Sequence, residues 1–103
     1  MSFEVRFTAQ ARDDLWRMYE HLLERATVLE DLAQADRALA AITDALENLK
    51  RSPFIYRKAE ADPFLREMII PFAGSGYVAL FEVENAGTVT VLAVRHQLED
   101  DYH

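Results

Sequence analysis

Residues 65–95, LREMIIPFAGSGYVALFEVENAGTVTVLAVR, decide the fold, because they hold three apolar runs separated by two short segments that contain glycine. Runs of this length that are rich in β-branched and aromatic residues predict strands, and the short links predict hairpin turns. The predicted strands are Leu65–Phe72, Tyr77–Glu84 and Thr88–Arg95, with turns at 74–76 and 85–87. Strands joined in this way form an antiparallel meander. Because few polar residues interrupt the middle run, we expect that strand to be central and covered on both faces.

The N-terminal segment predicts one strand followed by a helix. Phe3, Val5 and Phe7 alternate with polar residues, which is the period of a half-buried strand. Thr8 is a suitable N-cap, because its hydroxyl can accept a backbone N–H of the first helical turn. Asp13-Asp14 is expected near the helix start, where the helix dipole favours negative charge. The helix has one apolar stripe, formed by Ala11, Leu15, Met18, Tyr19, Leu22 and Ala26.

A second helix is expected after Thr27-Val28-Leu29-Glu30, which has the S/T-x-x-E pattern of a capping box. Apolar residues follow at alternating spacings of three and four, which predicts a seam packed on another helix or on a sheet. Ser52-Pro53 ends this helix, because proline has no N–H to donate and disfavours helical backbone in the residue before it. The short link between the helices predicts an antiparallel helical hairpin. The seam consists of Leu32, Ala35, Leu39, Ile42, Leu46 and Leu49.

These elements predict a single α+β domain over residues 1–103, with the order β-α-α-β-β-β. Half of the residues are hydrophobic, which is enough for one modest core. We expect the first strand to pair with an edge of the meander. The result would be a four-stranded antiparallel sheet packed against the α-helical hairpin.

Composition and charge exclude several functional classes. The chain has no cysteine, which excludes disulfides and thiolate chemistry, and its three histidines lack metal-ligand spacing such as H-E-x-x-H. It shows neither a signal-peptide pattern nor an apolar run long enough to span a bilayer. We therefore expect a cytoplasmic protein without membrane contact that uses no metal and no cofactor. The net charge of −7 argues against strong direct binding of nucleic acid.

The charge is unevenly distributed along the chain. Residues 1–49 and residues 67–103 each carry a net charge of −5, whereas residues 50–66 carry +3. This basic island is either ordinary solvated surface or a patch for an acidic peptide or a phosphate. The island consists of Lys50, Arg51, Arg57, Lys58 and Arg66.

Four segments carry motifs that indicate a protein family as well as a fold. Gly76–Phe81 and Val91–His96 are strand motifs, Leu65-Arg66-Glu67 opens a strand, and His96–Tyr102 reads HQLEDDY. These segments resemble the ParE/RelE toxin superfamily, often called plasmid-stabilisation proteins, in which a V-x-H-x-x-x-D-Y tail is common. The resemblance implies a bacterial toxin encoded beside its antitoxin in a type II toxin–antitoxin system. It also implies a hetero-oligomer, in which the flexible tail of a ParD-like antitoxin wraps the toxin and folds on it.

The superfamily has two main activities, and the resemblance alone does not choose between them. ParE-like members inhibit DNA gyrase by protein–protein binding, whereas RelE-like members are ribosome-dependent endoribonucleases that cut messenger RNA. Many members have an arginine directly after the tyrosine of the middle strand, and Val78 occupies that position here. With the acidic net charge, this favours a non-enzymatic, ParE-like toxin without catalytic residues. The alternatives are an endoribonuclease that uses Arg66, His96 and Tyr102, and a non-toxic binding module on the same scaffold.

Several side chains are candidates for contact with the antitoxin or the target. We expect acidic antitoxin residues near the basic island, and an apolar antitoxin segment beside the helical hairpin and a sheet edge. An exposed Trp16 would be an anchor, although tryptophan at this spacing is more often part of a core. Arg66 either pairs with Glu82 or Glu84 across the sheet, which is favoured, or binds a partner's carboxylate. His96 either forms a hydrogen bond at a strand end or acts as a general acid or base. The candidate contact residues are Trp16, Arg51, Arg57, Lys58, Arg66, Arg95 and His96.

Overall fold

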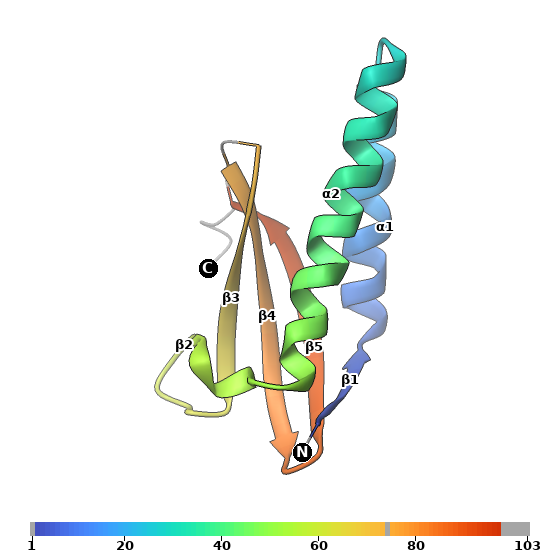
Figure 1. The fold of residues 1–103 in the computed structure, drawn as a ribbon. Coiled ribbons are helices and arrows are strands. Elements are labelled where there is room, and N and C mark those ends of the chain that lie inside the picture. Colours follow the sequence, from blue (N-terminus) through green and yellow to red (C-terminus); the bar gives the residue numbers. More distant parts are fainter. Residues whose placement is uncertain (1, 74, 98–103) are drawn as a thin grey trace.

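The computed structural model describes residues 2–73 and 75–97. One sheet forms a layer, and a helical hairpin covers one of its faces (Figure 1). The helices are α1 (Ala9–Glu24) and α2 (Leu29–Glu47), followed by 3-10 helices at Asn48–Lys50 and Pro53–Ile55. The strands are β1 (Glu4–Phe7), β2 (Arg57–Lys58), β3 (Leu65–Phe72), β4 (Ser75–Asn85) and β5 (Thr88–His96). None of the described helices combines the length and the apolar character needed to cross a membrane.

The meander predicted from residues 65–95 is confirmed, because β3, β4 and β5 are antiparallel neighbours with β4 in the middle. Tyr77, Ala79 and Phe81 of β4 are buried in the core cluster that includes residues of both helices. Val78 alternates with them and is only 2% exposed on the opposite face. The start of the central strand is therefore buried on both sides, as its apolar run predicts.

Gly76 allows β3 and β4 to approach closely. A Cβ added here would lie 2.3 Å from the carbonyl oxygen of Ile70, well inside van der Waals contact. We expect Gly76→Ala to lower the free energy of unfolding by about 2 kcal/mol, because the backbone must shift to make room. Gly87→Ala is the matched control, since its Cβ would lie 3.7 Å from Oδ1 of Asn85. Urea denaturation of both variants measures the difference, and equal small losses would contradict the close approach.

The prediction of a four-stranded antiparallel sheet is wrong about the direction of β1. The strand order is β1-β5-β4-β3-β2, and β1 runs parallel to β5, with Glu4 beside Thr88 and Phe7 beside Val91. The helical hairpin is the reason, because it returns the chain to the end of the sheet where β1 begins. β3 therefore starts in the direction of β1, and in a three-stranded meander both outer strands share that direction. A first strand that joins either edge must then be parallel to it.

The strand number is also wrong, because the sheet has five strands rather than four. The additional strand, β2, is antiparallel to β3, with Arg57 beside Glu67 and Lys58 beside Arg66. A strand of two residues has no alternation of polar and apolar side chains. Its position depends on the turn that follows it, so the sequence pattern could not predict it.

The two helices begin differently. Thr8 caps α1 as predicted: its Oγ1 accepts the N–H of Ala11 at 3.0 Å and donates to the carbonyl oxygen of Leu92 at 3.1 Å. The predicted capping box at residues 27–30 is wrong, because Val28 is the N-cap of α2. The carboxylate that reaches back belongs to Asp31, whose Oδ2 accepts the N–H of Thr27 at 2.9 Å. This hydrogen bond lowers the pKa of the Asp31 carboxyl.

The hydrophobic core lies between the sheet and the half of the helical hairpin that covers it. Ala35, Ile42, Leu46 and Leu49 of the predicted seam are buried. Leu32, near the tip of the hairpin, is 42% exposed. The reason is visible in Figure 1, where the hairpin extends past the end of the sheet and leaves an open angle between α1 and the end of β5.

Candidate functional site

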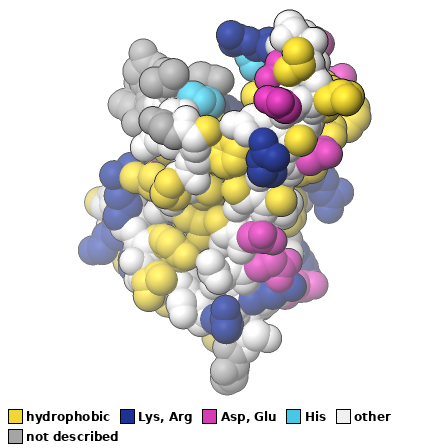
Figure 2. Space-filling view, turned by 45° about the horizontal axis from the view of Figure 1, so that its top comes forward, with side chains coloured by type: hydrophobic (Ala, Val, Ile, Leu, Met, Phe, Trp, Pro, Cys, Tyr) yellow, Lys and Arg dark blue, Asp and Glu magenta, His cyan; other side chains and the backbone are white. Residues whose placement is uncertain are grey.

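The open angle between α1 and the last residues of β5 contains a cleft of about 670 Å³. Figure 2 shows apolar side chains gathered between the sheet and the helical hairpin on this side of the molecule. The cleft exists because β1 pairs only with residues 88–91 of β5, so the later residues of that strand lie beside α1. Apolar lining comes from Met18, Leu22, Tyr77 and Val94, and polar lining from Asp14, Arg17, His21, Arg25, Arg95 and His96.

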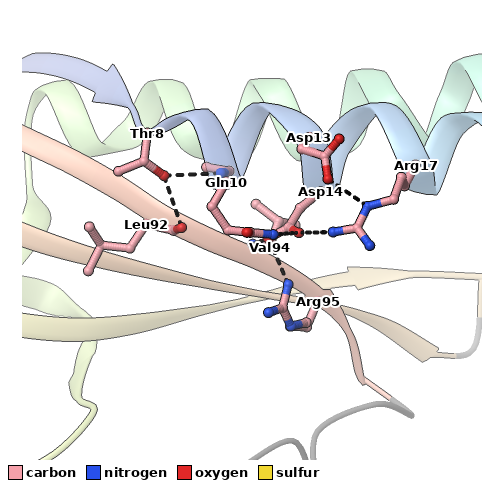
Figure 3. Close-up of polar contacts among 9 residues, drawn as sticks. Thr8, Gln10, Asp13, Asp14, Arg17, Leu92, Val94 and Arg95 are labelled. Atoms are coloured by element: carbon pink, nitrogen blue, oxygen red, sulfur yellow. Dashed lines mark hydrogen bonds and ion pairs between the residues drawn. The ribbon is translucent and has the colours of Figure 1, made fainter.

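Asp14 is the buried charge at the base of this cleft, with a side chain that is 2% exposed. Its Oδ2 accepts the backbone N–H of Val94 at 2.9 Å and Nη1 of Arg95 at 2.7 Å. Its Oδ1 accepts Nε2 of Gln10 at 2.7 Å and Nη2 of Arg17 at 3.0 Å. Figure 3 shows these side chains converging between α1 and β5. Each oxygen thus accepts two donors, which is how a buried carboxylate is stabilised.

This arrangement also protects the edge of β5 beyond the last residue of β1. The hydroxyl of Thr8 donates to the carbonyl oxygen of Leu92, and the carboxylate of Asp14 accepts the N–H of Val94 (Figure 3). Side chains of the N-cap and of α1 therefore satisfy backbone groups that a neighbouring strand would otherwise satisfy.

The cleft is cationic although the protein is acidic. Its lining residues include three arginines and one carboxylate, which belongs to Asp14. Arg17 also pairs with Asp13 through Nε at 2.8 Å. Arg25 lies at the C-terminal end of α1 and forms no ion pair with another described residue. Apolar walls with a positively charged rim suit a peptide segment that carries apolar and acidic side chains.

Tyr77 and His96 form the end of the cleft in the sheet. The two residues are cross-strand partners, and their rings meet edge to face with centroids 5.3 Å apart. His96 Nε2 lies 3.3 Å from Oγ of Ser75. Tyr77 is 4% exposed, and burial raises the pKa of its phenol.

The raised pKa of Tyr77 predicts a loss of stability in alkali. In the unfolded chain a tyrosine ionises with a pKa of about 10, whereas burial keeps the folded phenol neutral to higher pH. The neutral phenol of Tyr77 therefore contributes fully to the free energy of unfolding below the unfolded-state pKa. This contribution is lost as the pH rises through the folded-state pKa. Urea denaturation across the alkaline range measures the slope. We expect a smaller fall in Tyr77→Phe than in the unmodified chain, and identical slopes would contradict the assignment.

The structure places the predicted contact residues at separate locations. Arg95 and His96 line the cleft. Trp16 is 59% exposed on α1 and does not line it. Arg51 is exposed after the 3-10 helix that follows α2. The other predicted contact residues lie in β2 and at the start of β3, and they are Arg57, Lys58 and Arg66.

Arg66 does not form the favoured cross-strand ion pair. It lies opposite Phe81 rather than Glu82, and its guanidinium donates to backbone carbonyls, so the predicted pairing with Glu82 or Glu84 is wrong. The Nε–oxygen distance is 2.8 Å for Pro63, and the Nη1–oxygen distances are 2.7 Å for Tyr56 and 3.2 Å for Phe54.

The residues expected for a ribonuclease do not come together. Arg66 lies near the start of β3 and His96 ends β5, with β4 between them. Strand spacing and rise put their backbones roughly 16 Å apart, too far to act on one phosphodiester. Tyr102, the third residue of that set, lies outside the described residues. Within residues 2–73 and 75–97, no group of three or more potential ligands could hold a metal ion.

Sequence reasoning missed Asp14, Arg17 and Arg25 as site residues. The helix-dipole interpretation of Asp14 is incomplete, because this residue lies in the second turn of α1, six residues after the N-cap. A signal was available, because Asp14 falls between Ala11 and Met18 on the buried stripe. A carboxylate on an apolar stripe with an arginine three residues later indicates a buried ion pair.

A family model described as the ParE toxin of the type II toxin–antitoxin system parDE matches residues 5–101. Among solved structures, a chain from the chromosomal ParDE TA system of P. aeruginosa matches with a TM-score of 0.72 and 18% sequence identity. The alignment covers 91% of this chain and 95% of that chain, so the two share a fold. No curated protein matches the sequence.

Proposed function

The chain belongs to the ParE toxin family of type II toxin–antitoxin systems, and we propose that it inhibits DNA gyrase by protein–protein binding until a cognate antitoxin neutralises it. The observation that carries this proposal is the family match over residues 5–101. Inhibition by binding requires no catalytic group in the toxin. The separation of Arg66 from His96 supports this reading over RNA cleavage.

The cleft between α1 and β5 is the proposed antitoxin site. Its apolar walls can cover apolar side chains of the antitoxin tail, and Arg25 at the rim of the cleft can pair with a carboxylate of that tail. The solved chain with the same fold comes from a ParDE system, which supports an antitoxin partner for this chain. A tail that becomes ordered on binding can fill such a cleft over its whole length.

In this proposal the acidic antitoxin residues bind at the cleft and not at the basic island of residues 50–66. Lys50 pairs with Glu47 at 2.8 Å and Arg57 pairs with Glu67 at 3.0 Å, so neighbouring carboxylates already offset part of the charge of the island. Arg66 donates to backbone carbonyls. In the cleft, Asp13 and Asp14 likewise pair with Arg17 and Arg95, but Arg25 forms no ion pair with another described residue, and the arginines surround apolar side chains. The cleft is therefore the better complement to an acidic, apolar tail.

Induced expression in a bacterial culture tests the toxin function. We expect the chain alone to stop growth and to induce a DNA damage response while messenger RNA stays intact. Coexpression of the antitoxin encoded beside it should restore growth. Arrest accompanied by cleaved messenger RNA would replace this proposal with the ribonuclease reading, and normal growth at good expression would reject toxicity in that host.

A further inference from the structure

A second pocket, of about 550 Å³, lies at the end of β4 that is distant from the cleft. It is formed where the turn before β3 and the 3-10 helix at Pro53–Ile55 meet the last residues of β4. Tyr77 in the cleft and Glu84 in this pocket are seven positions apart on β4, which corresponds to roughly 23 Å. The two sites can therefore be occupied at the same time. The pocket is lined by Phe54, Asp62, Phe64, Glu82, Glu84 and Ala86, among others.

Two aromatic rings form the apolar part of this pocket. Phe54 is 47% exposed and Phe64 is 50% exposed, and their rings meet edge to face with centroids 6.3 Å apart. Arg66 fixes their position, because its Cζ lies 5.1 Å from the centroid of Phe54 and its Nε donates to Pro63 beside Phe64. The rings are thus held in place while about half of their surface remains in water. Exposed aromatic surface held in this way is typical of a binding site.

Three carboxylates surround the rings, and no described lysine or arginine lines the pocket. Asp62 Oδ1 accepts the N–H of Phe64 at 2.9 Å, and Glu84 accepts the hydroxyl of Thr90. Within the described part of the chain, none of Asp62, Glu82 and Glu84 forms an ion pair. The pocket therefore has a negative rim whose carboxylates form no ion pair among the described residues, and its nearest described cation is Arg66 against the ring of Phe54.

We propose that this pocket docks a segment of a partner protein in which an apolar side chain adjoins an arginine or a lysine. The apolar side chain covers the rings of Phe54 and Phe64, and the cation lies beside Glu82 and Glu84. The acidic tail proposed for the cleft is repelled here. The pocket is thus an interaction surface separate from the antitoxin site.

Peptide titration of the full-length 15N-labelled chain tests this proposal by NMR. The probe is the blocked tetrapeptide phenylalanine-arginine-leucine-arginine, and the matched probe replaces both arginines with glutamate. We expect saturable shifts of the backbone amides of Phe64 and Glu82–Ala86 with the basic peptide alone. Absence of saturable shifts, or equal shifts with the acidic peptide, would overturn the proposal.

Variants locate the binding within the pocket. Glu82→Arg should weaken binding of the basic peptide about tenfold, because a cation replaces an attractive carboxylate. Glu60→Arg is the control for net charge, since Glu60 is exposed and does not line the pocket. Phe64→Ala removes half-exposed apolar surface and should also weaken binding, which keeps the test valid if Glu82→Arg fails to fold. Unchanged affinity in Phe64→Ala would reject this pocket as the binding site.

Discussion

Replacement of Asp14 by alanine is expected to lower the free energy of unfolding by about 3–5 kcal/mol, because it leaves buried donors without their acceptor. The carboxylate accepts the N–H of Val94 at 2.9 Å and Nη1 of Arg95 at 2.7 Å on β5. It also accepts hydrogen bonds from Gln10 and Arg17 within α1. Because Asp14 itself lies in α1, loss of its hydrogen bonds to Val94 and Arg95 removes contacts that join the hairpin to the sheet. Urea denaturation followed by circular dichroism measures the change.

Asp13→Ala is the matched control for Asp14→Ala. Asp13 is the adjacent residue and also binds Arg17, at 2.8 Å, but its side chain is 57% exposed. An exposed ion pair contributes about 1 kcal/mol at most. Asp14→Asn keeps the shape of the side chain and should fall between the two. Equal losses in Asp13→Ala and Asp14→Ala would show that the buried network does not stabilise the contact between α1 and β5.

The double variant His21→Glu/Arg25→Glu is expected to weaken binding of the antitoxin about a hundredfold, because it reverses the charge of the cleft rim where the acidic tail binds. Both residues line the cleft and are exposed on α1 and its C-terminal end. Titration calorimetry with the antitoxin encoded beside the chain measures the affinity. Thermal unfolding of the variant checks that the fold is retained.

Arg12→Glu/Arg37→Glu is the control for long-range electrostatics. Both arginines are exposed and neither lines the cleft. The control changes the net charge by −4, more than the cleft variant does with His21 neutral. If affinity followed net charge alone, the control would lose more affinity than the cleft variant. Such a result would reject the cleft as the antitoxin site.

Residues 65–95 were sufficient to predict the meander, because its strands are long enough to show their pattern and its turns contain glycine. The bounds of β3 agree with the prediction, and β4 and β5 are longer by one or two residues at their ends. The direction of β1 depends on how the helical hairpin returns the chain, which is a property of the whole topology. That direction could have been deduced from the predicted element order, whereas β2 could not.

The candidate site was harder to predict, because it depends on contacts between distant parts of the sequence. Arg95 and His96 were identified from the C-terminal pattern, and both line the cleft. Asp14 meets Arg95 across 81 residues of sequence, and no local spacing indicates that contact. The contact of acidic antitoxin residues with the basic island stays a prediction. The charges of the island are neighbours in sequence, but several already bind carboxylates or carbonyls in the fold.

Gyrase inhibition is tested most directly by the supercoiling of relaxed plasmid by purified gyrase in the presence of the purified chain. We expect supercoiling to fall as the chain is added and to recover when the antitoxin is supplied. The His21→Glu/Arg25→Glu variant should still inhibit gyrase, but it should need far more antitoxin for recovery. Unchanged supercoiling with the chain in excess, together with cleavage of ribosome-bound messenger RNA, would contradict gyrase inhibition and favour ribonuclease activity.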